Sequence, residues 1–499
     1  MEARDYQRKI FPYYFFYILL KFFMNKTVAI FVNSEQKGFL TSLAQVLEDE
    51  YCFSTRLILR DHEVKKTVDK ILPNRSNDIV LSDIECLIDD VISESRYLEE
   101  KYKCRLSMLI SENRALGQGY LFNVEKIPDI IRASWSHEDK LREFIEIIKK
   151  HEIALNGCDF VIRQWPDKVT SMICREQNIC TYSFVKIKFG SRMFWSDNDY
   201  VTSSNLIKRI KNKSLTNHSG KSLDYVIESH GDKVNKSVNY TFSNALKSAI
   251  RLIWNDNKKW LRGMQKKDSY HYLGWLPSIF RQALNYKYIK SISVQPNQVS
   301  TYKLCFFPLH LEPEVALLNF SPEFNNSMEA ITWISKSLPA DTLLVVKEQA
   351  LSFGVRSNWY YRQINKIGNV VWADPDVHSW DWINQAEIIT TITGTVGVEA
   401  VHMKKPVVSF GAHQIINYLP TVRYVESYKQ TKLAIDEFLH GVIDEESFES
   451  ARSYLSDSQF ESSIELPEYE SLYLSNNLET ELAKRALKNL FSEYPVLLK

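Results

Sequence analysis

The sequence lacks any cysteine pattern that would crosslink the chain or hold a metal. Its seven cysteines are scattered over 499 residues, and no two of them form a Cys-x-x-Cys pair. This spacing argues against a disulfide framework and against a zinc site. It favours a reducing compartment, so we expect a cytoplasmic protein.

No hydrophobic run near the N-terminus is long enough to cross a bilayer. Residues 10–20 are apolar and aromatic, but a spanning helix needs about 20 residues. No small-residue cleavage site follows them, which argues against a signal peptide. The surrounding basic residues suit a segment lying at the membrane interface, in peripheral contact with the inner membrane. A helix packed on the first domain is the alternative.

The chain has almost no net charge, at +1, so no polyelectrolyte partner is implied for the whole molecule. Locally, residues 201–290 contain 17 Lys and Arg against 5 Asp and Glu, and residues 426–499 contain 15 acidic against 7 basic residues. The basic segment could hold an anionic lipid surface or a phosphorylated acceptor, or the two segments could pair with each other. No nucleic-acid-binding motif accompanies the charge, and we expect no nucleic acid partner.

Apolar, β-branched runs of strand length alternate with amphipathic helical stretches, which predicts an α/β fold with parallel sheets. The expected strands are 27–33, 57–59, 78–81, 159–163, 180–185, 302–307, 342–347, 370–373, 388–392 and 407–410. The expected helices include 39–47, 97–111, 139–151, 169–177, 327–338, 358–367, 379–385 and 396–404. We therefore predict five segments: 1–26, an aromatic N-terminal segment; 27–200, a Rossmann-like domain; 201–290, a basic helical insert or linker; 291–425, a second Rossmann-like domain; and 426–499, acidic C-terminal helices.

Residues 386–411 are the most informative stretch, because they predict a strand, a Gly turn, a short helix and a second strand. Gly394 and Gly397 allow a sharp turn and a close approach of the backbone to a ligand. Free N–H groups around Thr395 would face an anion, and Glu399 in the first helical turn would accept hydrogen bonds from a ribose. An ordinary α/β unit with a structural Gly turn is the alternative.

Other polar residues also follow predicted strands of the second domain. His310 and Glu314 come after the first strand, and Lys347 ends the next. Ligands of open α/β sheets lie at the carboxyl ends of strands, so these residues should converge with Thr393–Thr395. Lys347 would be a counter-charge for phosphate, or else a surface lysine at the start of a loop.

Three segments resemble the bacterial capsule polysaccharide biosynthesis family, which includes the Kdo transferases of capsule and lipopolysaccharide assembly. They are Phe307-Pro-Leu-His-Leu-Glu-Pro-Glu314, Leu338-Pro-Ala-Asp-Thr-Leu-Leu-Val-Val-Lys-Glu348, and Thr393-Gly-Thr-Val-Gly-Val-Glu-Ala400 followed by Lys405-Pro-Val-Val-Ser-Phe-Gly411. The resemblance is specific over about residues 300–425. One departure is Gln349-Ala350, where similar sequences have a His-Pro-like pair.

The resemblance implies a GT-B-like pair of Rossmann-type domains facing a cleft, a nucleotide sugar held mainly by the second domain, and no requirement for a metal or cofactor. It implies donor binding by Thr393, Gly394, Thr395, Gly397 and Glu399, with His310 and Glu314 lining the cleft. The function implied is transfer of a sugar from a CMP-Kdo-like or UDP-sugar donor to a growing glycan or glycolipid.

The residue that acts on the acceptor is not evident from the sequence. Glu35, Asp167 and His310 are candidates for it, with Arg163 and Arg192 as anion partners. Two rival functions remain: a non-catalytic binding protein of capsule assembly, and an enzyme resembling sugar-nucleotide 2-epimerases. The triplets Asp197-Asn-Asp199 and Asp374-Pro-Asp376 match a metal-binding pattern, but such triplets arise by chance among 61 acidic residues.

Overall fold

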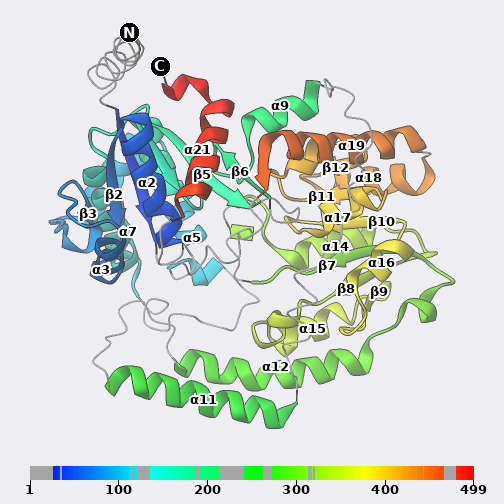
Figure 1. Cartoon of the computed structure of the whole chain (residues 1–499). Coiled ribbons are helices and arrows are strands. Elements are labelled where there is room, and N and C mark those ends of the chain that lie inside the picture. The colour runs from blue at the N-terminus through cyan, green and yellow to red at the C-terminus, as the bar shows by residue number, and fades with distance from the viewer. Residues whose placement is uncertain are drawn as a thin grey trace. The chain divides into compact units, whose positions relative to one another are not determined.

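The computed structural model describes residues 26–33, 36–113, 116–120, 135–186, 192–212, 241–261, 272–312, 317–318, 321–441, 443–465 and 479–498. The chain divides into two compact units (Figure 1). Unit 1 comprises residues 1–103, 142–206 and 459–499, and unit 2 comprises residues 104–141 and 207–458. The predictions for the N-terminal aromatic segment, Glu35 and Glu314 lie outside the described residues.

Unit 1 contains a seven-stranded sheet in the order β13-β6-β5-β4-β1-β2-β3. Its strands are β1 (Thr27–Val32), β2 (Ser54–Leu59), β3 (Ile79–Val80), β4 (Phe160–Arg163), β5 (Cys180–Lys186), β6 (Arg192–Ser196) and β13 (Ser463–Glu465). The first five are parallel, while β6 runs antiparallel to β5 and to β13. The chain order of the central strands reverses between β1 and β4, as in a Rossmann sheet.

Helices from both ends of the chain complete unit 1. They are α2 (Lys37–Tyr51), α3 (His62–Ile71), α4 (Val91–Tyr102), α8 (Lys168–Glu176) and α21 (Thr480–Glu493), with α7 (His137–Leu155) crossing the boundary between the units. The C-terminal helix α21 packs on α2, and Leu487 and Leu490 are fully buried in the core of this unit. The indole of Trp195 on β6 donates to the Ala486 carbonyl at 2.9 Å. The last helix of the chain is therefore part of the first sheet's core.

Unit 2 contains a six-stranded parallel sheet in the order β12-β11-β10-β7-β8-β9. Its strands are β7 (Lys303–Pro308), β8 (Thr342–Lys347), β9 (Val370–Trp372), β10 (Ile388–Thr391), β11 (Val407–Ser409) and β12 (Val422–Tyr424). Numbered within the unit, this is again the order 3-2-1-4-5-6, with the reversal between β7 and β10. The expectation of two Rossmann-type domains, the pair that defines a GT-B-like fold, is confirmed. The predicted cleft and the exact segment boundaries stay predictions.

The helices of unit 2 connect these strands and extend beyond the sheet. They are α5 (Leu106–Glu112), α9 (Ser204–Asn212), α11 (Phe242–Leu261), α12 (Tyr272–Ile292), α14 (Ser327–Ser337), α15 (Asn358–Ile364), α16 (Ser379–Gln385), α17 (Val396–His402), α18 (Tyr428–His440) and α19 (Glu445–Ser462). None of the helices in the described part of the chain is long and apolar enough to cross a membrane.

One predicted helix is divided into two in the structure. The stretch 97–111 forms the end of α4 and a separate α5, because Lys103 takes a left-handed conformation with φ 49° and closes α4. Arg105 then begins α5 from an extended backbone. Periodicity alone does not reveal a break of this kind, since a lysine rarely adopts positive φ.

Candidate functional site

The carboxyl ends of β7 and β10 meet where the strand order of unit 2 reverses, and His310 links them. Its Nε2 accepts a hydrogen bond from the Thr393 backbone N–H at 2.8 Å. Because a backbone amide can only donate, Nε2 carries no proton and the neutral imidazole holds its proton on Nδ1. The predicted convergence of His310 with Thr393 is thus present in the structure.

A buried polar cluster fixes the backbone beneath His310. The fully buried Arg356 guanidinium donates to the His310 carbonyl at 2.6 Å and to Glu348 Oε1 at 2.6 Å. It also pairs with Glu312 at 3.2 Å, while the Tyr361 hydroxyl donates to Glu348 at 2.8 Å. Burial raises the pKa of the Glu348 carboxyl, and the guanidinium and the tyrosine hydroxyl oppose that rise. The Arg356 guanidinium therefore binds the loop after β7 at two residues, His310 and Glu312.

Two backbone N–H groups stand open at the turn after β10. The neighbouring amides are satisfied, since Gly394 donates to Thr391 Oγ1 at 2.9 Å and Gly397 to the Gly394 carbonyl at 3.3 Å. The N–H groups of Thr395 and Val396 donate to no residue in the described part of the chain. No side chain caps α17; Thr395 is exposed, while Val396 is buried. Of the amides at 395–397 that were predicted to face an anion, only those of Thr395 and Val396 lack a hydrogen-bond acceptor among the described residues, and anion binding by them stays a prediction.

The glycines of this turn provide space and not an unusual backbone conformation. Neither Gly394 nor Gly397 has positive φ. A Cβ atom on Gly397 would lie 2.5 Å from Ile416 Cδ1, and one on Gly394 would lie 2.8 Å from Thr391 Oγ1. Gly411, at the end of the next strand, is tighter still, because a Cβ there would lie 2.2 Å from the Ile392 carbonyl oxygen. The turn is packed closely against β10 and β11.

Glu399 lies in the first turn of α17 and is oriented by a tryptophan from another helix. The Trp380 indole N–H, on α16, donates to Glu399 Oε2 at 3.1 Å. The backbone N–H of Trp380 in turn donates to His378 Nδ1 at 3.1 Å, and the two rings meet edge to face. Glu399 is half-buried and lies in the first turn of the helix that begins at Val396.

Lys347 ends β8, and its ammonium donates to backbone carbonyls of the loop before α16. The acceptors are the carbonyls of Pro375 at 3.0 Å and Val377 at 2.8 Å, with that of Asp374 at 3.5 Å. This contact was not predicted. Lys347 thus holds the loop that precedes α16, and α16 carries Trp380, which donates to Glu399.

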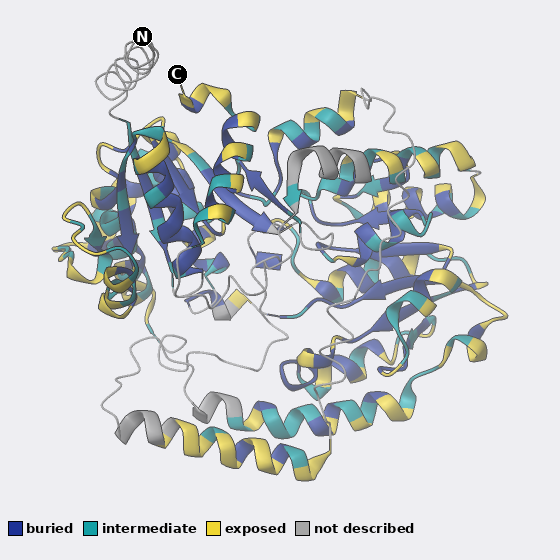
Figure 2. Cartoon of the chain, in the orientation of Figure 1, coloured by how far each residue is buried: buried dark blue, intermediate teal, exposed yellow. Residues whose placement is uncertain are grey.

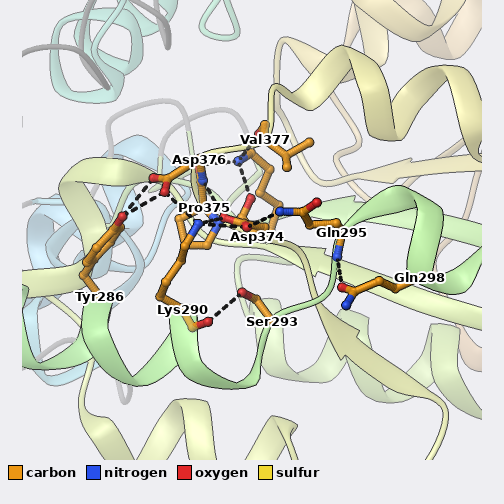
Figure 3. Close-up of polar contacts among 10 residues, drawn as sticks. Tyr286, Lys290, Ser293, Gln295, Gln298, Asp374, Pro375, Asp376 and Val377 are labelled. Carbon is orange, nitrogen blue, oxygen red and sulfur yellow. Dashed lines mark hydrogen bonds and ion pairs between the residues drawn. The ribbon is translucent and has the colours of Figure 1, made fainter.

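The Asp374-Pro-Asp376 triplet is bound to a lysine. Figure 3 shows Lys290 of α12 between the two carboxylates, with Nζ 2.6 Å from Asp374 Oδ1 and 2.7 Å from Asp376 Oδ2. Tyr286 donates to Asp376 at 2.9 Å, and burial with this carboxylate raises the pKa of Tyr286 to about 12. Among the described residues, no three His, Cys, Asp or Glu side chains are grouped so that they could hold a metal ion.

Arg163 and Asp167 contact each other in unit 1. Arg163 is buried and donates to the Asp167 carboxylate at 3.0 Å and to Ser171 Oγ at 2.6 Å. Asp167 also accepts from the Thr170 N–H at 2.7 Å and so caps α8. These contacts fix a helix N-terminus, which is a structural use of both residues. Arg192 begins β6, opposite Glu465 of β13.

The reversal point of unit 1 contains a polar pair that sequence reasoning missed. Asn33, after β1, donates from Nδ2 to Gln164 Oε1, after β4, at 2.5 Å. Gln164 is 2% exposed, and its Nε2 has no hydrogen-bond partner among the residues described. The pair stands at the same topological position as His310 and Thr393 in unit 2. A polar residue directly after each strand was the signal that could have revealed it.

Comparison with known families fits the geometry of the second sheet. Residues 262–414 match the family model described as capsule polysaccharide biosynthesis protein. Over these residues, which we call the family segment, the chain is similar to the capsule polysaccharide biosynthesis family. The family segment contains His310, the turn after β10, Glu399 and the Arg356 cluster. Among curated proteins, none matches the chain in sequence.

Several solved structures are similar at low identity. A Thermosulfurimonas dismutans KpsC, a beta Kdo 2,7 transferase, is 13% identical with a TM-score of 0.30, covering 57% of this chain and 79% of that one. A Neisseria meningitidis UDP-GlcNAc 2-epimerase bound to UDP-GlcNAc is 12% identical with a TM-score of 0.29, covering 94% and 100%. Anabaena Alr3699/HepE in complex with UDP-glucose is 9% identical with a TM-score of 0.31, covering 93% and 99%. These TM-scores are too low to support an argument about function.

Proposed function

We propose that this protein is a metal-independent glycosyltransferase of bacterial capsule or lipopolysaccharide synthesis, which takes its sugar from a nucleotide donor. The observation that carries the proposal is the pair of open amides at Thr395 and Val396, beside Glu399, at the reversal point of the family segment's sheet. Open amides suit a phosphate, and a carboxylate close by suits a ribose diol.

In the proposed mechanism the turn after β10 holds the donor's phosphates. The amides of Thr395 and Val396 stabilise the negative charge that develops on the nucleotide as the glycosidic bond breaks. Glu399 accepts hydrogen bonds from the ribose, with its orientation set by Trp380. His310 acts as a positioning residue, because its Nε2 holds the Thr393 amide and thereby the start of the turn.

The proposed acceptor is a growing glycan or glycolipid, bound by unit 1 on the cytoplasmic face of the inner membrane. The polar pair of Asn33 and Gln164 at the carboxyl edge of that sheet supports this placement of the sugar acceptor. The catalytic base or nucleophile is not assigned, because the Asp167 carboxylate is taken up by Arg163 and by the α8 cap.

Thermal stabilisation by CMP, CMP-Kdo, UDP and a panel of UDP- and GDP-sugars tests the donor site, since a ligand of the native state raises the melting temperature. We expect one nucleotide class to stabilise the protein and Glu399→Ala to abolish that stabilisation without lowering the ligand-free melting temperature. Glu387→Ala, on the loop before β10, is the control and should retain the shift.

Other outcomes separate the rival functions. Stabilisation that is unchanged in Glu399→Ala contradicts the site assignment. Donor consumption without any acceptor favours an epimerase-like or hydrolytic enzyme. The absence of a shift with every nucleotide, together with glycan binding, favours a non-catalytic role in capsule assembly, in keeping with Gln349-Ala350 standing in place of the His-Pro-like pair.

A further inference from the structure

The outer face of α11 exposes a row of large apolar side chains. Phe242 is 62% exposed, Leu246 49%, Ile250 59%, Ile253 38% and Trp254 70%. Their successive gaps of 4, 4, 3 and 1 residues place all five within about a third of the helix circumference, as one broad stripe. An apolar stripe of this length on an outer helix marks an interaction surface, since soluble proteins rarely expose contiguous apolar area.

The core of unit 2 does not need this stripe, because α11 uses another side to pack. Ala245 and Ala249 are buried where α11 contacts α12, whose own Ala283 is also buried. Figure 2 shows the two helices side by side, with exposed residues along α11. The small residues bring the helices close. Phe242, at the start of the stripe, contacts Phe280 of α12 with ring centroids 5.6 Å apart, while Leu246, Ile250, Ile253 and Trp254 continue the stripe as exposed side chains.

The partner helix α12 is held by the loop that contains Phe353 and Arg356. Asn285 donates to the carbonyls of Phe353 at 2.7 Å and Arg356 at 3.0 Å. Gly354 has its α-carbon so close to α12 that a Cβ there would lie 2.5 Å from the Ser278 carbonyl oxygen. Helix α12, on which α11 packs, is therefore tied to the loop that carries Arg356.

Positive charge borders the stripe on one side. Lys247 and Arg251 are exposed and follow Leu246 and Ile250 by one residue each, so they lie along the same edge of the stripe. No acidic residue occurs between Thr241 and Asn255, and the chain continues into Lys258, Lys259, Arg262, Lys266 and Lys267. This face of α11 therefore fits a partner that has an apolar interior and a negatively charged surface.

We propose that the outer face of α11 docks on an anionic lipid bilayer, inserting its apolar stripe to the acyl boundary while Lys247 and Arg251 contact headgroup phosphates. Helices with an apolar stripe bordered by cations lie in the membrane interface, and each Lys or Arg near an anionic surface strengthens binding. This proposal identifies α11 as an element by which the proposed transferase contacts the membrane, and it does not depend on donor binding. It adds a second membrane-contact element to the one predicted for residues 1–26.

Co-sedimentation of the full-length protein with vesicles tests this proposal. We expect binding to vesicles of phosphatidylcholine mixed with phosphatidylglycerol, and weaker binding to phosphatidylcholine alone. Leu246→Ser with Ile250→Ser should weaken binding to both vesicles by at least about tenfold, because two inserted side chains are lost. Lys247→Glu with Arg251→Glu should weaken binding to the anionic vesicles by roughly tenfold or more and leave the neutral ones unchanged.

The matched control is Leu433→Ser on α18, which removes another side chain that is 58% exposed and should bind as the unmodified chain does. Equal melting temperatures establish that each variant is folded. Vesicle binding that none of the α11 changes weakens overturns the proposal, as does the absence of binding to either vesicle. Self-association without vesicle binding, lost in Leu246→Ser with Ile250→Ser, overturns it in favour of a second copy of the chain. The donor thermal shift should be the same in all these variants, so the two proposals fail separately.

Discussion

His310 stabilises the turn after β10, because its Nε2 accepts a hydrogen bond from the Thr393 backbone N–H. Replacing it with Phe leaves the buried N–H of Thr393 without a partner, which costs about 1–3 kcal/mol of unfolding free energy. His310→Gln retains an acceptor oxygen and should lose clearly less. Urea unfolding of the two variants measures the difference. Equal losses in both would show that ring packing, and not the hydrogen bond, is what the site requires.

Trp380 offers a second test at the residue scale, because it contacts the donor site only through Glu399. Trp380→Phe keeps the aromatic body and removes the indole N–H that holds Glu399 Oε2. We expect donor affinity to fall roughly fivefold, in line with about 1 kcal/mol for one hydrogen bond, while stability changes little. Titration calorimetry with the nucleotide found by the thermal screen measures it. An unchanged dissociation constant would remove Trp380 from the site.

Sequence reasoning found the residues of this site that directly follow strands and missed those that reach it from elsewhere. His310 and Thr393 were predictable because parallel strands bring their carboxyl ends to one edge, and Glu399 because it lies in the first turn of the helix that follows the Gly turn. Arg356 and Trp380 were not, since each contacts a partner that lies far along the chain, and no local pattern records such pairing. The same limit applies to Lys347, whose carbonyl partners are contributed by the loop after β9.

At the scale of the element, α17 is shorter than predicted and ends in a specific way. It stops at His402, and Lys404 takes a left-handed conformation with φ 55°. Lys405 N–H then donates to the Ala400 carbonyl at 2.9 Å and Lys404 N–H to that of Val401 at 3.2 Å, the two bonds of a Schellman end. The predicted helix 396–404 was wrong at its C-terminal end, because it included Met403 and Lys404, which form the cap.

The last residue of α17 makes stability depend on pH. Burial, together with Arg452 on α19, lowers the pKa of His402 from 6.5 to about 4. The unfolded chain therefore binds a proton at His402 more readily than the native one, and stability is lost as pH falls from about 6.5 towards 4. Between these pH values, His402 lowers the free energy of unfolding by about 2 kcal/mol, a figure reduced to allow for its partial exposure to solvent.

His402→Gln should flatten that part of the pH profile. Urea unfolding at pH 7.5 and pH 5 for both proteins isolates the effect, because the numerous carboxylates titrate in the same way in each. An identical pH dependence in the variant would show that His402 titrates normally in the native state.

The elements that could be predicted are those with a local signature, and those that could not depend on distant pairing. Strands such as β8 and β10 are apolar, β-branched runs and were placed within a residue. The strands β6 and β13 were not foreseen, because β13 pairs with β6 across more than half of the chain. The acidic C-terminal residues behave similarly: Glu445 pairs with Lys404 and Glu437 with Arg423. Pairing of this segment with the basic insert stays a prediction.

At the scale of the whole molecule, the same strand order occurs twice, and each sheet has its own hydrophobic core. The core of unit 1 includes residues from both ends of the chain, because α21 packs on α2. The core of unit 2 is built from residues between 289 and 438. A defect in the C-terminal helix should therefore be felt in the N-terminal sheet and not in the family segment.

Leu490→Ala tests this separation. Leu490 is fully buried against unit 1, so the substitution should cost about 3 kcal/mol there. Hydrogen exchange followed by peptide mass spectrometry should show faster exchange in α2, β1 and β4, with β7, β8 and β10 unchanged. Thermal stabilisation by the donor nucleotide should persist, since the proposed site lies in unit 2. Ile334→Ala on α14 is the reciprocal control and should accelerate exchange in the second set of strands alone. Faster exchange in both sets from either change would mean that the two cores unfold as one cooperative structure, and donor binding would then depend on the C-terminal helix as well.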